Sequence, residues 1–562
     1  MIEFPPGLLL ILGAIIVPLL PQVVRNAYML ALPIVGFWGL LMIPEGVHFA
    51  FGIFGYTLTP VRVDGLSLVF GYIFHIAAAI SIIFAFHIKD PVQQMAGLVY
   101  AGAAIGGAFA GDLISLFVYW EATAIASVFL IWSSKTEAAY QTGMRYLIIQ
   151  VGSGVLLLAG TIIHFKTTGS LEFTKMGLTG LGPSLIFIAF GIKAAFPLLH
   201  SWLKDSYPQA TVTGTVFLSA FTTKLAIYAL ARGFPGTDML IWIGAAMAIF
   251  PIFYAIIESD LRRVLAYSLN HQLGFMVVGI GIGTELSLNG TAAHAFASVL
   301  YKGLLFMSMG AVLYRTGTIK AAELGGLYKS MPYTAAFCIV GAACISAFPL
   351  LSGFISKSLI ISATAKEGYW IVWLVLLFAS VGAIFHSGIR IPYFTFFHKD
   401  SGKRPQEAPA NMLVAMAIAA FLCIAIGVYP APLYAILPFD VKYVPYTTTH
   451  IVTQLQLILF SALAFTYLVK KGLYPSQLKS INLDFDWTYR RLLPKILKSL
   501  SNIFVPADKY VRTVFLNRVE RFITGVFRHH GPEGLLARTW ATGSTVLWVA
   551  VLLALYMVFY FV

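Results

Sequence analysis

Long apolar runs separated by short polar stretches recur along the whole 562-residue chain. Runs of about 18–25 residues match the length that a helix needs to cross the hydrocarbon core of a bilayer. No soluble domain of ordinary size fits between them, so the pattern predicts an all-α polytopic membrane protein. The sixteen predicted spans are 6–22, 26–44, 64–87, 92–110, 112–132, 143–165, 182–200, 211–231, 239–257, 262–284, 290–314, 333–361, 369–396, 410–437, 452–470 and 540–562.

The composition agrees with this interpretation. Apolar residues make up 59% of the chain and charged residues only 11%, against about 25% charged in soluble domains. The net charge of +14 is scattered over short loops, which favours contact with anionic lipids and argues against binding of nucleic acid. The three cysteines, Cys338, Cys344 and Cys423, lie in apolar runs and are interpreted as packing residues, so we predict no metal site.

Basic residues also predict the orientation of the chain in the membrane. Loops after odd-numbered spans carry many more Lys and Arg residues than loops after even-numbered spans. The positive-inside rule therefore places the odd loops in the cytoplasm and the N-terminus outside, and with sixteen spans the C-terminus is external too. The run 6–22 lacks a basic segment and a cleavage site, so it is predicted to be a spanning helix rather than a removed signal.

The segment 471–539 differs from the rest of the chain. Its Lys and Arg residues alternate with large apolar residues at roughly helical spacing. This pattern predicts one or two amphipathic helices that lie on an anionic leaflet or dock on a partner subunit. Pro494 and Pro506 are expected to interrupt these helices, and the span 540–562 is expected to anchor the tail.

Ionisable residues inside spans are energetically costly and by default indicate an ion pathway. Glu121, Lys193, Lys224 and Lys357 lie in four different predicted spans. A buried lysine beside a carboxylate is able to take up and release a proton near neutral pH, because desolvation and the carboxylate affect its proton affinity in opposite directions. The alternative for each lysine is that its span end is misplaced and the side chain snorkels to the interface.

Histidines are also frequent in the apolar runs. His294 lies eight residues before Lys302 in one predicted span, so both side chains face roughly the same side of the helix. His271 is a possible relay residue, since histidine titrates near neutral pH. For Lys302 the alternative is a static structural contact, and for the histidines it is haem ligation, although no facing pair at a clear spacing emerges.

Two of the predicted spans share the string AFPLL. Pro197 follows Lys193 within it, and Pro349 precedes Lys357. A proline frees a backbone carbonyl and breaks the helix, which a bilayer tolerates only where protein or water satisfies the backbone. Interruptions at matching places in two halves of a chain indicate inverted repeats with the ion site at the break. Spans four to eight and nine to thirteen are the candidate repeats.

These motifs together resemble a known family. In chain order they are FVYWEATAIAS, GIKAAFPLLHSWLKDSYPQA, LSAFTTKLAIYALAR, HAFASVLYKGLLFMSMGAV and FPLLSGFISKSLI. They resemble the motifs of the antiporter-like subunits shared by Mrp-type cation/proton antiporters and respiratory complex I, over roughly residues 60–470. Within the family the chain is most similar to the Mrp D-type subunit. It departs from the common pattern at Lys204, Gln209, Thr211, His271 and Ser298.

The resemblance implies a core of about fourteen helices with two inverted five-helix repeats and broken helices. It implies a proton path through Glu121, Lys193, Lys224 and Lys357, with His294 and Lys302 bridging two half-channels. The expected division is 1–91 for the N-terminal helices, 92–235 and 236–400 for the repeats, 401–470 for further core helices, and 471–562 for the basic segment and the terminal anchor.

Three functions are compatible with the sequence. The first is a subunit of a multi-subunit antiporter that exchanges H⁺ for a cation, with Na⁺ expected, in a bacterial or archaeal cell membrane. The second is a proton-pumping subunit of a redox enzyme such as complex I or a membrane hydrogenase. The third is a subunit that energises uptake of another substrate, such as inorganic carbon. The chain carries no flavin, iron–sulfur or nicotinamide signature, so cofactors and any enzymatic activity would belong to partner subunits.

Overall fold

The computed structural model describes residues 5–53, 55–474, 482, 484–531, 534 and 542–561. The chain forms two units, Met1–Asn482 and Leu483–Val562, and each is described by itself.

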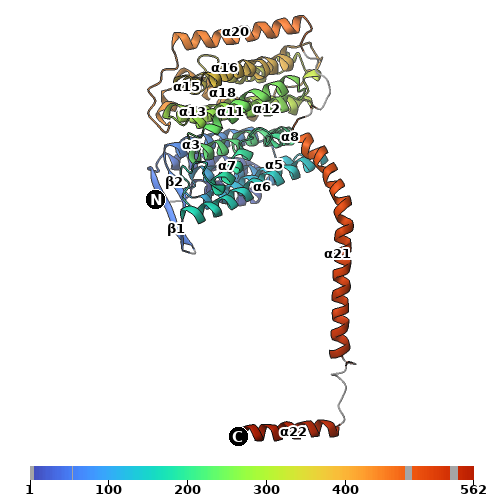
Figure 1. Cartoon of the computed structure of the whole chain (residues 1–562). Helices are drawn as coiled ribbons and strands as arrows, with labels where there is room; N and C mark the ends of the chain where they lie inside the picture. The colour runs from blue at the N-terminus through green and yellow to red at the C-terminus, as the bar shows by residue number, and fades with distance from the viewer. Residues whose placement is uncertain are drawn as a thin grey trace. The chain divides into compact units, whose positions relative to one another are not determined.

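The first unit is a bundle of helices that run side by side (Figure 1). Its α-helices are α1 (Pro6–Ile16), α2 (Gln22–Leu40), α3 (Gly65–Phe84), α4 (Pro91–Phe109), α5 (Leu113–Trp132), α6 (Glu137–Thr168), α7 (Leu181–Lys193), α8 (Ser201–Gln209), α9 (Val212–Ala220), α10 (Thr222–Gly233), α11 (Asp238–Ile257), α12 (Leu261–Ile282), α13 (Glu285–Thr316), α14 (Pro332–Ile345), α15 (Ser352–Lys366), α16 (Trp370–Ala383), α17 (Arg390–Pro392), α18 (Ala410–Val428), α19 (Ala431–Ala435) and α20 (Thr448–Lys470). Shorter pieces are the 3₁₀ turns η1 (Val17–Leu19), η2 (Ala321–Glu323) and η3 (Leu327–Lys329) and the π-helical segments η4 (Ile384–Ile389) and η5 (Tyr393–Phe397).

Every predicted span corresponds to helix, but the predicted count of sixteen is too high. Among the described residues, twelve helices are long and apolar enough to cross a membrane. The predicted spans 6–22, 182–200 and 333–361 contain α1, α7 and α14, which end early, and the span 92–110 corresponds to α4, which is not one of the twelve. The difference arises mainly because helices stop at internal breaks that a count of apolar residues runs across.

The spanning part is helical as predicted, but one hairpin at the end of the bundle was not predicted (Figure 1). Strands β1 (Gly46–Ile53) and β2 (Tyr56–Val63) pair antiparallel, with Ile53 opposite Tyr56. The alternation in GVHFAFGI is the ordinary signal of a strand.

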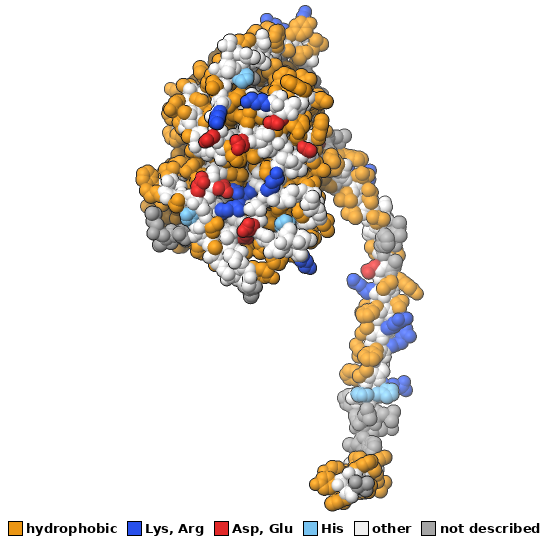
Figure 2. Space-filling model, turned by 60° about the vertical axis from the view of Figure 1, so that its left-hand side comes forward, with side chains coloured by type: hydrophobic (Ala, Val, Ile, Leu, Met, Phe, Trp, Pro, Cys, Tyr) orange, Lys and Arg blue, Asp and Glu red, His pale blue; other side chains and the backbone are white. Residues whose placement is uncertain are grey.

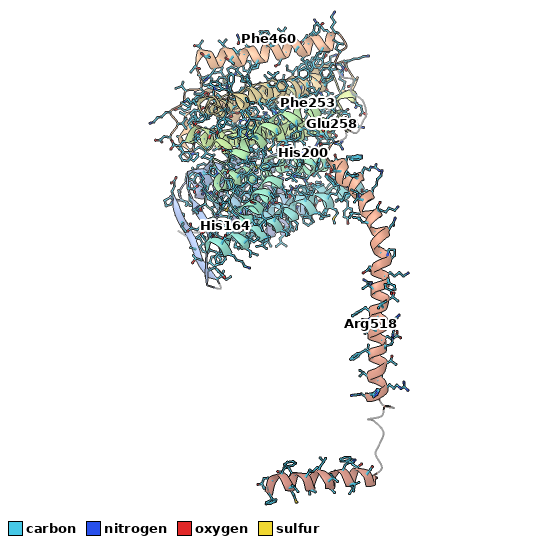
Figure 3. All side chains as sticks on the ribbon, viewed as in Figure 1. His164, His200, Phe253, Glu258, Phe460 and Arg518 are labelled. Atoms are coloured by element: carbon cyan, nitrogen blue, oxygen red, sulfur yellow. The ribbon has the colours of Figure 1, made fainter. Side chains whose placement is uncertain are left out.

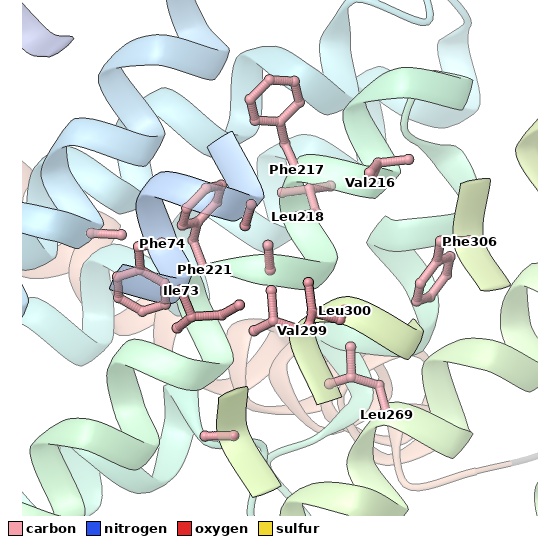
Figure 4. Packing of buried hydrophobic residues seen from close by; sticks show 14 of the residues in the cluster. Ile73, Phe74, Val216, Phe217, Leu218, Phe221, Leu269, Val299, Leu300 and Phe306 are labelled. Atoms are coloured by element: carbon pink, nitrogen blue, oxygen red, sulfur yellow. The ribbon is translucent and has the colours of Figure 1, made fainter. Parts of the chain in front are cut away.

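The bundle has one large apolar core and a second, smaller apolar cluster between α11, α12, α15 and α16. Figure 4 shows Phe74 of α3, Phe221 at the end of α9, and Leu300 of α13 packed in one cluster. Phe253 of α11 and Phe460 of α20, both labelled in Figure 3, are exposed on the outside of the bundle. In Figure 2 charged side chains gather in the middle of one face of the bundle, with apolar side chains around them. This distribution is typical of a protein that presents a belt of apolar side chains to lipid and a polar end to water.

Two parts of the first unit have closely matching local structure. The helices α6 and α13 each contain 32 residues, begin after a threonine (Thr136 or Thr284), and end at a left-handed glycine (Gly169 or Gly317). Each is flanked by one antiparallel bridge, Asp112 with Glu172 and Asp260 with Lys320.

The second unit contains the π-helical turn η6 (Thr488–Leu492), the helix α21 (Leu493–His530) and the helix α22 (Thr542–Phe561). The prediction that Pro506 interrupts the basic segment is wrong, because Pro506 lies inside α21, a single helix of 38 residues. Pro494 lies in the first turn of α21, where its missing N–H has no intrahelical partner to lose. Of the predicted tail and anchor, residues 475–481, 483, 532–533, 535–541 and 562 lie outside the described residues.

Gly244 of α11 and Gly274 of α12 allow the two helices to pack closely. A Cβ on Gly244 would lie 2.5 Å from the backbone nitrogen of Val278 and 2.7 Å from the carbonyl oxygen of Gly274. These are backbone atoms, so a side chain at Gly244 forces the two helices apart.

We therefore predict that Gly244→Val destabilises the bundle by about 1–3 kcal/mol, the usual cost of overpacking. A lower unfolding temperature of the purified protein in detergent measures this effect. Gly152→Val in α6 is the control, because a Cβ at Gly152 has no neighbour within 4 Å. An equal loss of stability in both variants would contradict the close backbone contact of Gly244 with α12.

Candidate functional site

Both AFPLL strings lie at helix breaks. α7 ends at Lys193 and α8 begins at Ser201, while α14 ends at Ile345 and α15 begins at Ser352. Inside each break an alanine and a leucine have positive φ: 60° at Ala195 and 70° at Leu198, then 54° at Ala347 and 70° at Leu350. A non-glycine residue in this region is strained, and such strain persists only where the surrounding structure enforces it.

Side chains donate hydrogen bonds to backbone carbonyls that have lost their helical partners at the breaks. Trp202 donates from Nε1 to the carbonyl of Ile192 over 2.9 Å. At the second break Lys357 donates from Nζ to Ile345 over 3.2 Å, and Gln454 of α20 donates to Ser346 over 2.8 Å. The breaks are therefore satisfied by protein groups, as a helix interruption in a bilayer requires.

Lys193 is fully buried against α5. Its Nζ donates to the carbonyl of Trp120 and, over 2.9 Å, to Oγ1 of Thr123. The same Nζ lies 4.4 Å from the centre of the Trp120 ring, which adds a cation–π contact.

Glu121 follows Trp120 on α5 and interacts electrostatically with Lys193. Its Oε1 is buried and has no hydrogen-bond partner among the described residues, while Lys193 donates to backbone and hydroxyl oxygens. The carboxylate lies against Gly154 of α6, and a Cβ at Gly154 would overlap Oε1. The glycine thus leaves the space that the carboxylate occupies.

Lys224 lies at a break that was not predicted. The predicted span 211–231 is two helices, because α9 ends at Ala220 and α10 begins at Thr222. Lys224 donates from Nζ to the carbonyl of Ser219 over 2.8 Å, just before this junction. The segment contains no proline, so the usual sequence signal of a break is missing.

His294 and Lys302 both reach from α13 to the same side of α12. Lys302 donates from Nζ to Oγ of Ser268, and His294 Nε2 lies 3.0 Å from Oε1 of Gln272. His294 Nδ1 lies 3.1 Å from Oγ of Ser356, the residue before Lys357 on α15.

The charge of Lys302 interacts with both Lys224 and Lys357. Ser298, one turn after His294, donates to the carbonyl of Ala295 over 3.0 Å and takes no part in the contacts to α12.

A short polar chain extends from Lys302 into η4. Ser268 Oγ lies 2.7 Å from Ser387 Oγ, which lies 2.7 Å from Nδ1 of His386. The ring centre of His386 lies 5.4 Å from that of His271, whose Nδ1 lies 2.6 Å from the carbonyl oxygen of Ala248.

His386 lies inside the predicted span 369–396 and is one of several histidines suited to a relay, but the sequence did not single it out as a site residue. The signal that identified the lysines would have identified it too. Ser268, Ser387 and Gln272 carry no such signal, because polar uncharged residues are common in spans.

The described residues contain no group of three His, Cys, Asp or Glu side chains able to hold a metal ion. Cys338, Cys344 and Cys423 are buried free thiols. The fold and the site together define a multi-pass membrane protein whose ionisable side chains are buried at or near helix interruptions.

Comparisons with known proteins agree with this class. Residues 110–383 match the family model of the transmembrane region of NADH:quinone oxidoreductases and Mrp antiporters. The D-type subunit of the Na⁺/H⁺ antiporter of Alkalihalophilus pseudofirmus is 31% identical over 296 residues, which cover 49% of this chain and 60% of that protein. The chain spans about half the length of the curated relatives it matches first, with 52%, 40% and 60% of them covered.

Two solved structures have the same fold. The Mrp complex from Dietzia sp. DQ12-45-1b contains a chain that matches with a TM-score of 0.77 and 22% identity, covering 93% of this chain and 62% of that one. The membrane-bound sulfane sulfur reductase, an archaeal respiratory membrane complex, contains one with a TM-score of 0.71 and 20% identity, covering 99% and 100%. The chain is therefore similar to the antiporter-like membrane subunits of the Mrp and complex I superfamily.

The packing of Glu121 on Gly154 generates a prediction. Gly154→Ala should displace the carboxylate, the flexible partner in this contact, and change the infrared C=O or carboxylate band that Glu121→Gln removes. Gly152→Ala, two residues away on α6 and without neighbours within 4 Å, should leave the band unchanged. An unaltered band in Gly154→Ala would contradict the placement of the carboxylate.

Proposed function

We propose that the chain is the proton-translocating subunit of a multi-subunit cation/H⁺ antiporter, with Na⁺ as the exchanged cation. The observation that carries this proposal is the set of buried lysines in the first unit. Lys193, Lys224 and Lys357 each donate to a backbone carbonyl, the first from the end of α7 and the other two at helix junctions. Such groups are costly in a membrane and are retained where ions move.

The proposed path has two halves joined in the middle of the bundle. Protons reach Lys193 and Lys224 from the cytoplasmic side, pass His294 and Lys302, and exchange with the external side through Lys357. The hydrogen bonds of His294 and Lys302 to α12, and the electrostatic contact of Lys302 with Lys224 and Lys357, support the bridging role. His271 and His386 extend the relay beside Lys302.

Glu121 is proposed to control the proton affinity of Lys193. Moving one charge through the membrane potential is worth about 2.3 kcal/mol per 100 mV, and a tenfold change in proton affinity is worth about 1.4 kcal/mol. Approach and withdrawal of one carboxylate therefore act on the same energy scale as the driving force. The unpartnered Oε1 of Glu121 supports a carboxylate that is free to turn toward Lys193.

The two halves are proposed to be inverted repeats over 92–235 and 236–400. The matching caps of α6 and α13, the paired bridges, and the identical pattern of positive φ in the two AFPLL breaks support this relation. Pro197 and Pro349 occupy the same place in the two breaks. Residues 1–91 and 401–470 flank the repeats.

The surroundings of the chain are part of the proposal. Other membrane subunits would complete the antiporter, and the basic side chains of α21 would contact anionic lipid or a neighbouring subunit. The location is a bacterial or archaeal cell membrane with the N-terminus outside.

A second function has a specific observation in its favour. The similarity to the chain of the archaeal sulfane sulfur reductase complex extends over 99% of this chain, including the second unit. The chain would then pump protons for a redox complex whose cofactors lie in other subunits. A Na⁺ gradient applied to vesicles that contain the assembled complex separates the two: proton movement without any redox substrate favours the antiporter.

The central test replaces the charged groups in the assembled complex. Lys193→Ala and Glu121→Gln should each lower proton-coupled transport by about 100-fold or more, as expected for loss of a proton-transfer group. Transport is measured by quenching of a pH-sensitive dye in vesicles with equal amounts of complex. Lys442→Ala, in an exposed position outside the helices, should leave transport unchanged. Full transport by a normally assembled Lys193→Ala complex would refute the mechanism.

The tail generates a separate prediction. Deleting 471–562 should reduce the yield of assembled complex, because the basic segment and its anchor are proposed to dock the protein in its assembly. The first unit should still form, since it has its own core, and far-UV circular dichroism of the truncated chain should remain helical. Normal assembly of the truncated chain would show that the tail has no docking role.

A further inference from the structure

A cavity of about 270 Å³ lies between α15, α16 and α20 and begins at Lys357. At its inner end are Ala347 and Phe354 beside the second break. At its outer end are Thr449 and His450, in the first turn of α20. The cavity therefore follows α15 from the break to the end of the bundle where α20 begins. Figure 1 shows α20 at the edge of the bundle beside α16.

The lining of this cavity is mixed in character. Half of its residues are polar: Lys357, Ser358, Ser362, Thr449, His450, Thr453 and Gln454. A water molecule needs two to four polar partners and occupies about 30 Å³ in the liquid, so the cavity has room and partners for several waters. The apolar residues, among them Trp373 and Leu457, form the side toward α16 and the body of α20.

A hydrogen-bonded series of side chains leads from the cavity to its mouth. Ser362 Oγ lies 2.9 Å from the hydroxyl oxygen of Tyr443, and this hydroxyl lies 3.2 Å from Nδ1 of His450. Nδ1 also lies 3.3 Å from the carbonyl oxygen of Pro445, which accepts from a protonated nitrogen. The nitrogen therefore has a partner in either protonation state.

The inner end of the cavity is also fixed by hydrogen bonds. Lys357 and Gln454 donate to the consecutive carbonyls of Ile345 and Ser346. Because Gln454 belongs to α20, this helix closes the break on one side while its first turn carries His450. One element thus contacts both ends of the cavity.

We propose that this cavity is the water-filled route by which the proton of Lys357 reaches the external face, and that His450 is the group that exchanges it with bulk water. Ser362 and Tyr443 pass the proton between the cavity water and His450. The inference rests on the proposed function for the direction of use, but the route itself depends only on the cavity and its side chains.

Water access is tested first, by cysteine labelling of the full complex in its membrane. Ser362→Cys should react with a charged, membrane-impermeant thiol reagent applied on the side that labels Lys442→Cys, which lies in the loop before α20. Leu374→Cys, on an exposed position of α16, is the matched control for a lipid-facing site and should not react. The native cysteines are buried and give the background. A cavity filled by a lipid chain would leave Ser362→Cys unlabelled, which overturns the proposal.

The role of His450 is tested by transport and chemical rescue. His450→Ala should lower proton-coupled transport about tenfold, a smaller effect than the usual loss of a proton-transfer group because water can partly replace the ring. Added imidazole should restore most of it, and Tyr443→Phe should lower transport without responding to imidazole. Unchanged transport in His450→Ala, or a loss that imidazole does not relieve, would remove His450 from the route.

The labelling test fails independently of the proposed function. Labelling of Ser362→Cys needs no transport, so it reports on the cavity even if Lys193→Ala retains full activity. Conversely, an unlabelled cavity together with an inactive Lys193→Ala would leave the antiporter proposal standing and reject only this route.

Discussion

The structure depends on one constraint: an ammonium group buried among apolar helices needs an oxygen to which it can donate. A regular helix offers few such oxygens, because each of its carbonyls already accepts one hydrogen bond within the helix. At two of its buried lysines the protein meets this need by interrupting helices. Lys224 and Lys357 donate to the carbonyls of Ser219 and Ile345 beside such junctions. Lys193 instead ends α7 and donates across to α5. At Lys224 and Lys357 the charge and the helix interruption therefore belong together.

The buried lysines also interact with one another. Lys302 interacts electrostatically with Lys224 and Lys357, and all three lysines are buried. Positive charges that share a low-dielectric region disfavour one another. In the proposed mechanism this repulsion couples the two breaks without any large movement of the helices.

Much of this site could be predicted from the sequence, and the remainder has physical reasons. Charged residues inside apolar runs are rare, so Glu121, Lys193 and Lys357 were identified by position alone. The junction before Lys224 lacks a proline, and the π-helical segment with His386 depends on packing that no local pattern encodes. The strands of the hairpin show alternating polar and apolar residues, but a search for long apolar runs does not detect them. Pro506 misled the prediction, because α21 continues through a proline.

Glu121 and Lys193 differ in how firmly their side chains are held. The lysine is fixed by three contacts with α5, two hydrogen bonds and the face of Trp120. The carboxylate rests on Gly154, and its buried Oε1 has no donor among the described residues. A buried unsatisfied oxygen is costly, so the carboxylate gains most from any rearrangement that brings a donor or a proton. Within this pair the lysine is therefore the more constrained side chain and the carboxylate the less constrained one.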